Sequence, residues 1–109
     1  MIPSEFVEEA LSLPGVAEHA HFDRRAFKIE GKRIFATLHE ASRTVNLKLS
    51  EVDQSIFAAY EGKTIYAVRN KWGLRGWTTF ELEQTPKELI RDAVNTAYQE
   101  ALKTKGKKK

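Results

Sequence analysis

The chain has 109 residues and a mass of 12.5 kDa, which is the size of a single domain. It contains no Cys, which excludes disulfide scaffolds and thiol nucleophiles, and no apolar run of the roughly 18 residues that a membrane span requires. The net charge of +3 divides unevenly, because residues 103–109 hold five Lys and no acid, whereas residues 1–102 hold 13 basic and 15 acidic residues.

The first predicted element is a helix from about Glu5 to Leu13. Ser4 stands at its capping position, and Pro14-Gly15 follows it as a stop signal. Apolar residues at helical spacing are expected to face the core, namely Phe6, Val7, Ala10 and Leu11. Residues 16–23 show no clear periodicity and are predicted to form a connector.

Three strands are predicted after the connector. The first two, 26–29 and 33–38, flank the turn Glu30-Gly31-Lys32, as in a β-hairpin. The third strand, 44–49, has the clearest alternation of the chain. Its apolar members are Val45, Leu47 and Leu49. One face of the sheet is therefore expected to be buried and the other exposed.

A second helix is expected to begin after Ser50, whose hydroxyl is a good cap, and to end near Gly62. Its inner face is predicted to consist of Val52, Ile56, Phe57 and Tyr60. Two further strands are predicted over 64–68 and 76–82. The intervening segment, 69–75, is too polar and too rich in Gly for a strand and is predicted to be a loop.

The last predicted helix has the strongest signals. Thr85 stands at the capping position, Pro86 at the first helical position, and Glu88 completes a capping box. Apolar residues then recur at three- and four-residue steps: Leu89, Ile90, Ala93, Val94, Ala97, Tyr98 and Leu102. The order α-β-β-β-α-β-β-α predicts an α+β domain with an antiparallel sheet.

One domain is therefore expected over 1–102, followed by a lysine-rich, disordered tail over 103–109. The N-terminus lacks the basic start and apolar run of a signal peptide, so we expect a cytoplasmic protein. The tail would attract any polyanion weakly and without sequence preference.

Four segments resemble those of the MmcQ/YjbR family of small bacterial proteins. In chain order they are ALSLPGVAE at 10–18, AFKIEGKRIFA at 26–36, VNLK at 45–48 and NKWGLRGWT at 70–78. The resemblance, over residues 10–98, implies a CyaY-like (frataxin-like) fold with two layers, in which helices pack on one face of an antiparallel sheet. It also implies DNA binding. Other members carry a shorter N-K-x-H-W loop, whose His has no counterpart in this chain.

The loop over 69–77 is the first candidate for a binding site. It contains three basic residues, two Trp and no acid, and its two Gly would permit a tight turn or a close approach to a ligand. In a DNA complex its cations would contact phosphates and Asn70 would reach a base edge. Alternatively, one of Trp72 and Trp77 folds back to fill the end of the core.

The exposed sheet face is the second candidate. If Ile34, Val45, Leu47 and Phe80 face the helices, strand alternation directs the residues between them outward. The outward set is Lys28, Arg33, Phe35, Asn46, Lys48, Tyr66 and Trp77, joined by Glu81. Basic and aromatic side chains on a sheet suit polyanion binding. A solvated face without a ligand, or a surface for a protein or small molecule, would have a similar composition.

His19, His21 and Asp23 are of the residue types that bind metals. Three ligands within five residues of a connector are rarely preorganised, so a surface loop without metal is the favoured interpretation. The chain has no nucleophile elbow, phosphate loop or dinucleotide motif. We therefore expect no enzyme and no cofactor.

The sequence thus predicts a non-catalytic, monomeric module that binds double-stranded DNA. Its predicted phosphate contacts are Lys28, Lys48, Arg69, Lys71 and Arg75, and its predicted stacking or groove contacts are Trp72 and Asn70. The charge of −2 over residues 1–102 argues against tight binding. The alternative is a protein-interaction or small-ligand-binding domain that uses the same face.

Overall fold

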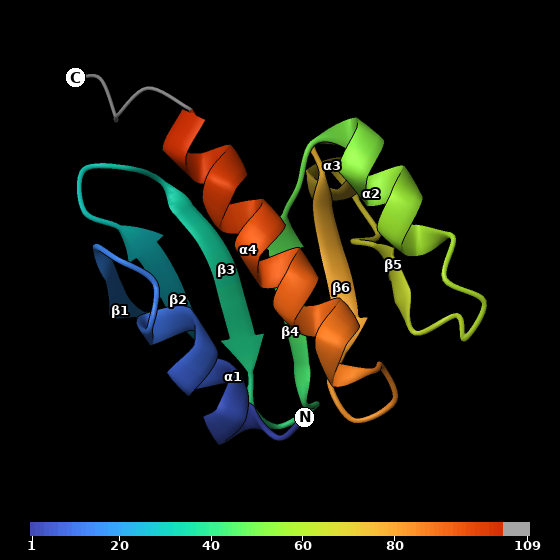
Figure 1. The fold of residues 1–109 in the computed structure, drawn as a ribbon, viewed down its shortest axis with the longest axis horizontal. Helices are drawn as coiled ribbons and strands as arrows, with labels where there is room; N and C mark the ends of the chain where they lie inside the picture. Colours follow the sequence, from blue (N-terminus) through green and yellow to red (C-terminus); the bar gives the residue numbers. More distant parts are fainter. Residues whose placement is uncertain (104–109) are drawn as a thin grey trace.

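A computed structural model describes residues 1–103 as one six-stranded sheet and four helices (Figure 1). The strands are β1 (Val16–His21), β2 (Arg24–Ile29), β3 (Ile34–His39), β4 (Thr44–Lys48), β5 (Ile65–Ala67) and β6 (Trp77–Glu81). The helices are α1 (Pro3–Leu11), α2 (Glu51–Ala58), α3 (Lys71–Leu74) and α4 (Lys87–Lys103). The strand order is β1-β2-β3-β4-β6-β5, and all neighbouring strands are antiparallel. The predicted α+β class is confirmed, although β1 and α3 were not predicted.

Helices α1, α2 and α4 cover one face of the sheet and form the second layer (Figure 1). Phe6 of α1 lies edge-on to Phe27 of β2, with ring centroids 5.7 Å apart, and Phe57 of α2 lies edge-on to Phe80 of β6 at 5.8 Å. The core lies between these helices and the sheet. The opposite face of the sheet is therefore available for a site.

The segment predicted as a connector forms the edge strand β1 instead. It pairs with β2 from Val16 opposite Ile29 to His21 opposite Arg24. Its last four residues are exposed, so no alternation of apolar and polar residues marks it in the sequence. Pairing with β2 overrides the absence of a hydrophobic pattern.

A bulge in β3 reverses the faces of two residues. The pairing register shifts between Phe27 and Lys28, so that Lys28 lies opposite Ile34 and Phe35 is the inserted residue. Phe35 is only 1% exposed, and its ring lies 6.0 Å from that of Tyr98 in α4. The prediction that Ile34 faces the helices and Phe35 faces outward is therefore wrong, because alternation fails at a bulge.

The first helix begins two residues earlier than predicted. The Glu5 carboxylate accepts a hydrogen bond from the backbone N–H of Ile2 at 3.0 Å, so Ile2 and not Ser4 occupies the capping position. Pro3 is then the first helical residue, where a missing N–H costs nothing. Leu11, expected in the core, lies in the last turn and is 42% exposed.

The second helix has the predicted cap but a different inner face. Ser50 Oγ accepts a hydrogen bond from the Asp53 N–H at 3.0 Å, which confirms the cap. Val52 and Ile56 are 69% and 63% exposed, so their predicted burial is wrong. The helix lies over β5, an edge strand of only three residues, and ends at Ala58, before the predicted Gly62. A short edge strand leaves most of the helix without a surface to cover.

The last helix extends from Lys87 to Lys103, one residue into the predicted tail. Residues 104–109, the rest of that tail, lie outside the described residues. The Thr85 hydroxyl is buried and lies 2.7 Å from that of Thr64, which ties the turn before α4 to the strand region. Leu102, predicted in the core, is 40% exposed. No helix of the described residues is long and apolar enough to cross a membrane.

Candidate functional site

A cavity of about 440 Å³ opens at the end of the sheet where β3 and β4 separate. The two strands pair from His39 opposite Thr44 to Ala36 opposite Leu47, and the residues beyond that point line the cavity. Helix α4 contributes its last turns to the lining. We call this cavity the basic pocket. Its lining residues are Lys28, Lys32, Arg33, Ile34, Phe35, Lys48, Trp72, Arg75, Trp77, Ala97, Glu100 and Ala101.

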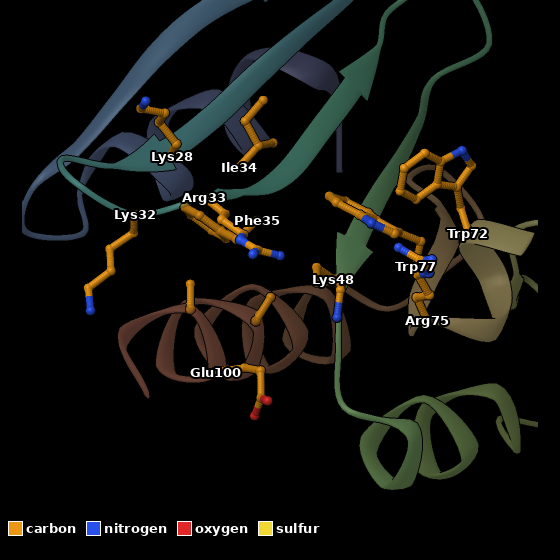
Figure 2. Close-up of a pocket in the computed structure, with 12 residues that line it drawn as sticks. Lys28, Lys32, Arg33, Ile34, Phe35, Lys48, Trp72, Arg75, Trp77 and Glu100 are labelled. Atoms are coloured by element: carbon orange, nitrogen blue, oxygen red, sulfur yellow. The ribbon is translucent and has the colours of Figure 1, made fainter. Parts of the chain in front are cut away.

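The basic pocket has five cationic side chains and one acidic side chain, Glu100. This excess of positive charge contrasts with residues 1–102 as a whole, which carry two more acidic than basic residues. Figure 2 shows Lys28 and Lys32 on one side of the pocket, with Trp72, Trp77 and Arg75 on the opposite side. A cavity lined by charge of one sign concentrates field and attracts anions.

The short helix α3 positions one wall of the pocket. Asn70 Oδ1 accepts a hydrogen bond from the Trp72 N–H at 2.9 Å and caps the helix. The Arg75 guanidinium carbon lies 5.7 Å from the centre of the Trp72 ring, a cation–π distance. Asn70, predicted to reach a base edge, therefore has a structural role as the cap, while its NH2 group keeps two donors for the predicted contact. Arg69 and Lys71, predicted phosphate contacts, lie outside the pocket lining.

Gly73 and Gly76 allow the chain to approach its own backbone and not a ligand. A Cβ on Gly73 would lie 1.9 Å from the carbonyl oxygen of Val68, and one on Gly76 would lie 1.9 Å from that of Leu49. Gly76 also has a φ of +100°, and its carbonyl accepts a hydrogen bond from the Leu49 N–H at 3.0 Å. The two glycines therefore hold α3 and β6 against neighbouring chain segments.

Both tryptophans line the basic pocket, and neither belongs to the buried core. Trp77 is half-buried in β6 opposite Lys48, and Trp72 is 49% exposed. The alternative in which one indole fills the end of the core is therefore wrong. Phe35, which the bulge turns toward the helices, is buried and lines the same cavity as the two tryptophans.

The open sheet face holds a second cavity, of about 300 Å³, next to the basic pocket. We call it the Arg24 pocket. Its lining residues are His21, Arg24, Thr37, Asn46, Val68, Trp72 and Trp77. The two tryptophans therefore belong to both cavities. Asn46 and Trp77 lie on this face as their strand positions predict, whereas Arg24 lies before residue 26, the predicted start of its strand, and was not predicted there.

Beyond the Arg24 pocket, Tyr66 and Glu81 lie on the same open face, as predicted. The Tyr66 hydroxyl donates a hydrogen bond to Glu81 Oε2 at 2.9 Å. Burial raises the pKa of Tyr66 above its usual value, and the bond to Glu81 adds to this effect. Each of these two side chains thus has a hydrogen-bond partner within the protein.

His19, His21 and Asp23 do not form a cluster. Asp23 Oδ2 lies 3.2 Å from His39 Nε2, on the neighbouring part of the sheet, and His19 and His21 are exposed on the edge strand. Among residues 1–103, no three His, Cys, Asp or Glu side chains are grouped so that they could hold a metal ion. The pattern in the sequence therefore corresponds to an edge strand and a turn.

The geometry and the four sequence motifs agree with the comparisons. A family model described as YjbR matches residues 11–100. The chain belongs to the YjbR family. Its structure is similar to that of Deinococcus radiodurans protein DR2400, with domain DUF419, at a TM-score of 0.80 and 18% identity over 94% of this chain and 80% of that chain. At this identity the likeness concerns the fold alone. No curated protein matches the chain.

Proposed function

We propose that this YjbR-family protein binds DNA, with phosphate groups held in the basic pocket. The observation that carries the proposal is the gathering of five cations around one cavity of a domain that is otherwise slightly acidic. Lys28, Lys48 and Arg75 are among the predicted phosphate contacts, and they line this cavity together with Arg33. Phosphate contacts supply most of the affinity of sequence-independent DNA binding.

Trp72 provides a contact of a different kind. It is 49% exposed beside Arg75, so part of its ring is accessible to a base or a sugar. Stacking between a base and an indole tolerates any base sequence. Arg69 and Lys71, which lie outside the pocket, would contact phosphates further along the duplex. The proposed complex is therefore one of weak sequence preference and strong salt dependence.

A small anionic ligand in the basic pocket is the second candidate function. The concave shape favours it, because a volume of about 440 Å³ lies within the range of small-molecule sites. Such a ligand would fill the cavity where β3 and β4 separate, whereas DNA would pass across its mouth. The two functions differ in the ligand that saturates the site, and a single titration distinguishes them.

The test is a Trp-fluorescence titration of the full chain with a short DNA duplex. Arg75→Gln and Lys48→Gln are expected to weaken binding about tenfold each, because each removes a charge from the pocket. Lys63→Gln is the matched control, since it removes an exposed charge from the turn before β5. A further variant replaces the five Lys of 103–109 by Gln.

Binding that disappears only in the tail variant would contradict the proposal, because the domain would then take no part. Equal losses in Arg75→Gln and Lys63→Gln would contradict it as well, because they would show a general effect of charge. Saturable binding of inorganic phosphate by a chain that binds no duplex would favour the second candidate.

A further inference from the structure

The Arg24 pocket is a different environment from the basic pocket, although the two share Trp72 and Trp77. We propose that it is a separate binding site for a small organic anion, in which the Arg24 guanidinium holds a carboxylate or phosphoryl group. The apolar part of the ligand would lie against the indoles and Val68. This proposal goes beyond DNA binding and does not depend on it.

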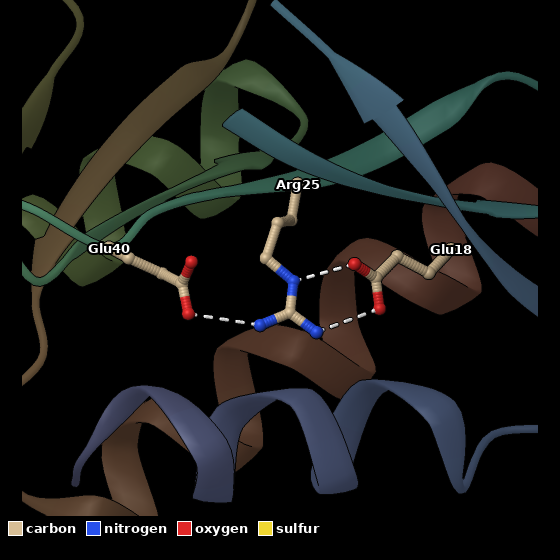
Figure 3. A network of polar contacts seen from close by, with 3 residues as sticks. All are labelled: Glu18, Arg25 and Glu40. Carbon is tan, nitrogen blue, oxygen red and sulfur yellow. Dashed lines mark hydrogen bonds and ion pairs between the residues drawn. The ribbon is translucent and has the colours of Figure 1, made fainter. Parts of the chain in front are cut away.

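The two adjacent arginines of β2 provide the first observation. Arg25 points to the helix-covered face, where its Nε and Nη2 donate to Glu18 at 2.6 and 3.0 Å and its Nη1 donates to Glu40 at 3.0 Å (Figure 3). These carboxylates hold the pKa of Arg25 above its usual value. The charge of Arg25 is thus neutralised within the protein.

Arg24, on the opposite face, has only neutral hydrogen-bond partners. Its Nε donates to Thr37 Oγ1 at 3.2 Å, and its Nη2 lies 3.3 Å from the Asn46 carboxamide oxygen when that amide also donates to Thr79 Oγ1. Within residues 1–103, no carboxylate lies within 4.0 Å of the Arg24 guanidinium. The nearby Asp23 carboxylate pairs with His39 instead.

The burial of Arg24 makes this arrangement costly without a ligand. Its side chain is partly buried, and burial lowers the pKa of Arg24 below its usual value, which Asp23 offsets in part. A partly desolvated cation is stabilised by an anionic partner far more than an exposed one. The neutral partners fix the position of the guanidinium and leave its charge for a ligand.

The free donors of Arg24 define the chemical class of the ligand. A guanidinium has five N–H donors, and the contacts to Thr37 and Asn46 use two of them. The remaining donors form a planar fork that matches the two oxygens of a carboxylate or phosphoryl group. The volume of about 300 Å³ is at the lower end for small-molecule sites, which suits an acid with a single ring or a short chain.

The test uses three probes of one shape: benzoate, phenyl phosphate and the neutral benzamide. Binding to the full chain is followed by Trp fluorescence and by the ¹⁵N-¹H signal of Arg24 Nε. We expect at least one of the two anions to saturate the site and benzamide to bind about tenfold more weakly or not at all. The preferred anion identifies a carboxylate or a phosphoryl group as the natural one.

Variants separate the pocket from the rest of the surface. Arg24→Gln is expected to weaken anion binding at least about tenfold, and Arg24→Lys to recover only part of it, because Lys lacks the planar fork. Lys63→Gln removes an exposed charge from outside the pocket lining and is expected to leave anion binding unchanged. Thr37→Val removes a hydrogen-bond partner of Arg24 but leaves its charge in place, so it is expected to weaken anion binding less than Arg24→Gln does. Circular dichroism of each variant verifies that it is folded.

Three results would overturn the proposal. Benzamide could bind with the same affinity as the anions, or Arg24→Gln could bind the anions with the affinity of the unaltered chain. The third is that neither anion shows saturable binding up to about 10 mM. None of these results bears on DNA binding in the basic pocket. Conversely, loss of duplex binding in Arg75→Gln with intact benzoate binding would show that the two sites act separately.

Discussion

The Glu18 carboxylate accepts two hydrogen bonds from Arg25, and these bonds lower the pKa of Glu18 below its ordinary value of 4.5. A carboxylate with a lowered pKa in the folded state stabilises the fold at pH values above its unfolded pKa. That stabilisation is lost as the pH falls through the folded-state pKa. The pair ties the edge strand β1 to β2, so the loss loosens the edge of the sheet.

We therefore expect Glu18→Gln to lower the melting temperature at pH 7 and to have a smaller effect at an acidic pH of about 3, below the ordinary pKa of a glutamate. Thermal unfolding followed by circular dichroism at both pH values measures the difference. Glu8→Gln on the exposed side of α1 is the control. A deficit in Glu18→Gln that is the same at both pH values would show that the ion pair with Arg25 does not stabilise the fold.

Among single residues, Arg24 and Asn70 show where inference from sequence stops. Asn70 lies among basic and aromatic residues, which suggests a role in binding, but its side chain caps α3. Arg24 lies before the predicted start of its strand at residue 26, and the pairing of β2 with β1 and β3 places it on the open face. The contacts of these two polar side chains therefore could not be predicted from the residues next to them in the sequence.

At the scale of the elements, the sequence predicted those features that depend on neighbouring residues, such as strand alternation and helix caps. Val45 and Leu47 alternate with polar residues and are fully buried in the central strand β4, and Ser50 caps α2. The bulge at Phe35 could not be predicted from the sequence, because it depends on the register between β2 and β3. Strand β1 could not be predicted either, because an exposed edge strand needs no apolar pattern and forms through its pairing with β2.

In the turn from α3 into β6, Gly76→Ala is expected to lower the free energy of unfolding more than Gly31→Ala does in the β2–β3 turn. In Gly31→Ala the new Cβ meets no atom within 4 Å, so only the φ of +78° opposes the change, at a cost of about 1–2 kcal/mol. In Gly76→Ala a similar backbone strain is joined by a clash with the Leu49 carbonyl. We expect a loss of about 3 kcal/mol or more.

Urea unfolding of both variants measures these losses as free energies of unfolding. Gly31→Ala is the matched control, because it isolates the effect of the positive φ from that of the clash. Equal losses in the two variants would show that the chain around Leu49 moves aside at no cost. In that case the wall of the basic pocket would be less rigid than the contact implies.

At the scale of the whole molecule, the candidate site is assembled from distant segments. The pocket joins the β2–β3 hairpin, the end of β4, the segment from α3 to β6, and α4. Lys28, Lys48, Trp72 and Arg75 could be predicted as site residues from their own surroundings in the sequence. Glu100 could not, because it contributes only through the packing of α4 against the sheet.

The uneven distribution of charge leads to a prediction about salt. If each of the five cations of the basic pocket neutralises one phosphate, they alone give the logarithm of the DNA association constant a slope of about −4.5 against the logarithm of salt concentration, and Arg69 and Lys71 make the slope steeper. We expect a slope at least this steep in the variant that lacks the tail lysines, and a steeper one in the unaltered chain. Arg75→Gln is expected to reduce the slope by about one, and Lys63→Gln to leave it unchanged.

Duplex titrations at about 50 and 200 mM salt give these slopes. A slope near zero without the tail lysines would mean that the folded part of the chain makes no phosphate contacts. An identical slope in Arg75→Gln would place the contacts elsewhere on the surface.

The common wall of the two cavities has one further consequence. Trp72 and Trp77 line both the basic pocket and the Arg24 pocket. A ligand that reorients either indole on one side changes the free energy of binding on the other. Thermodynamic linkage requires the two sites to alter each other's affinity by the same factor. If both proposed sites bind and either ligand moves an indole, saturation with benzoate will change the affinity for the duplex, and the duplex will change the affinity for benzoate by the same factor.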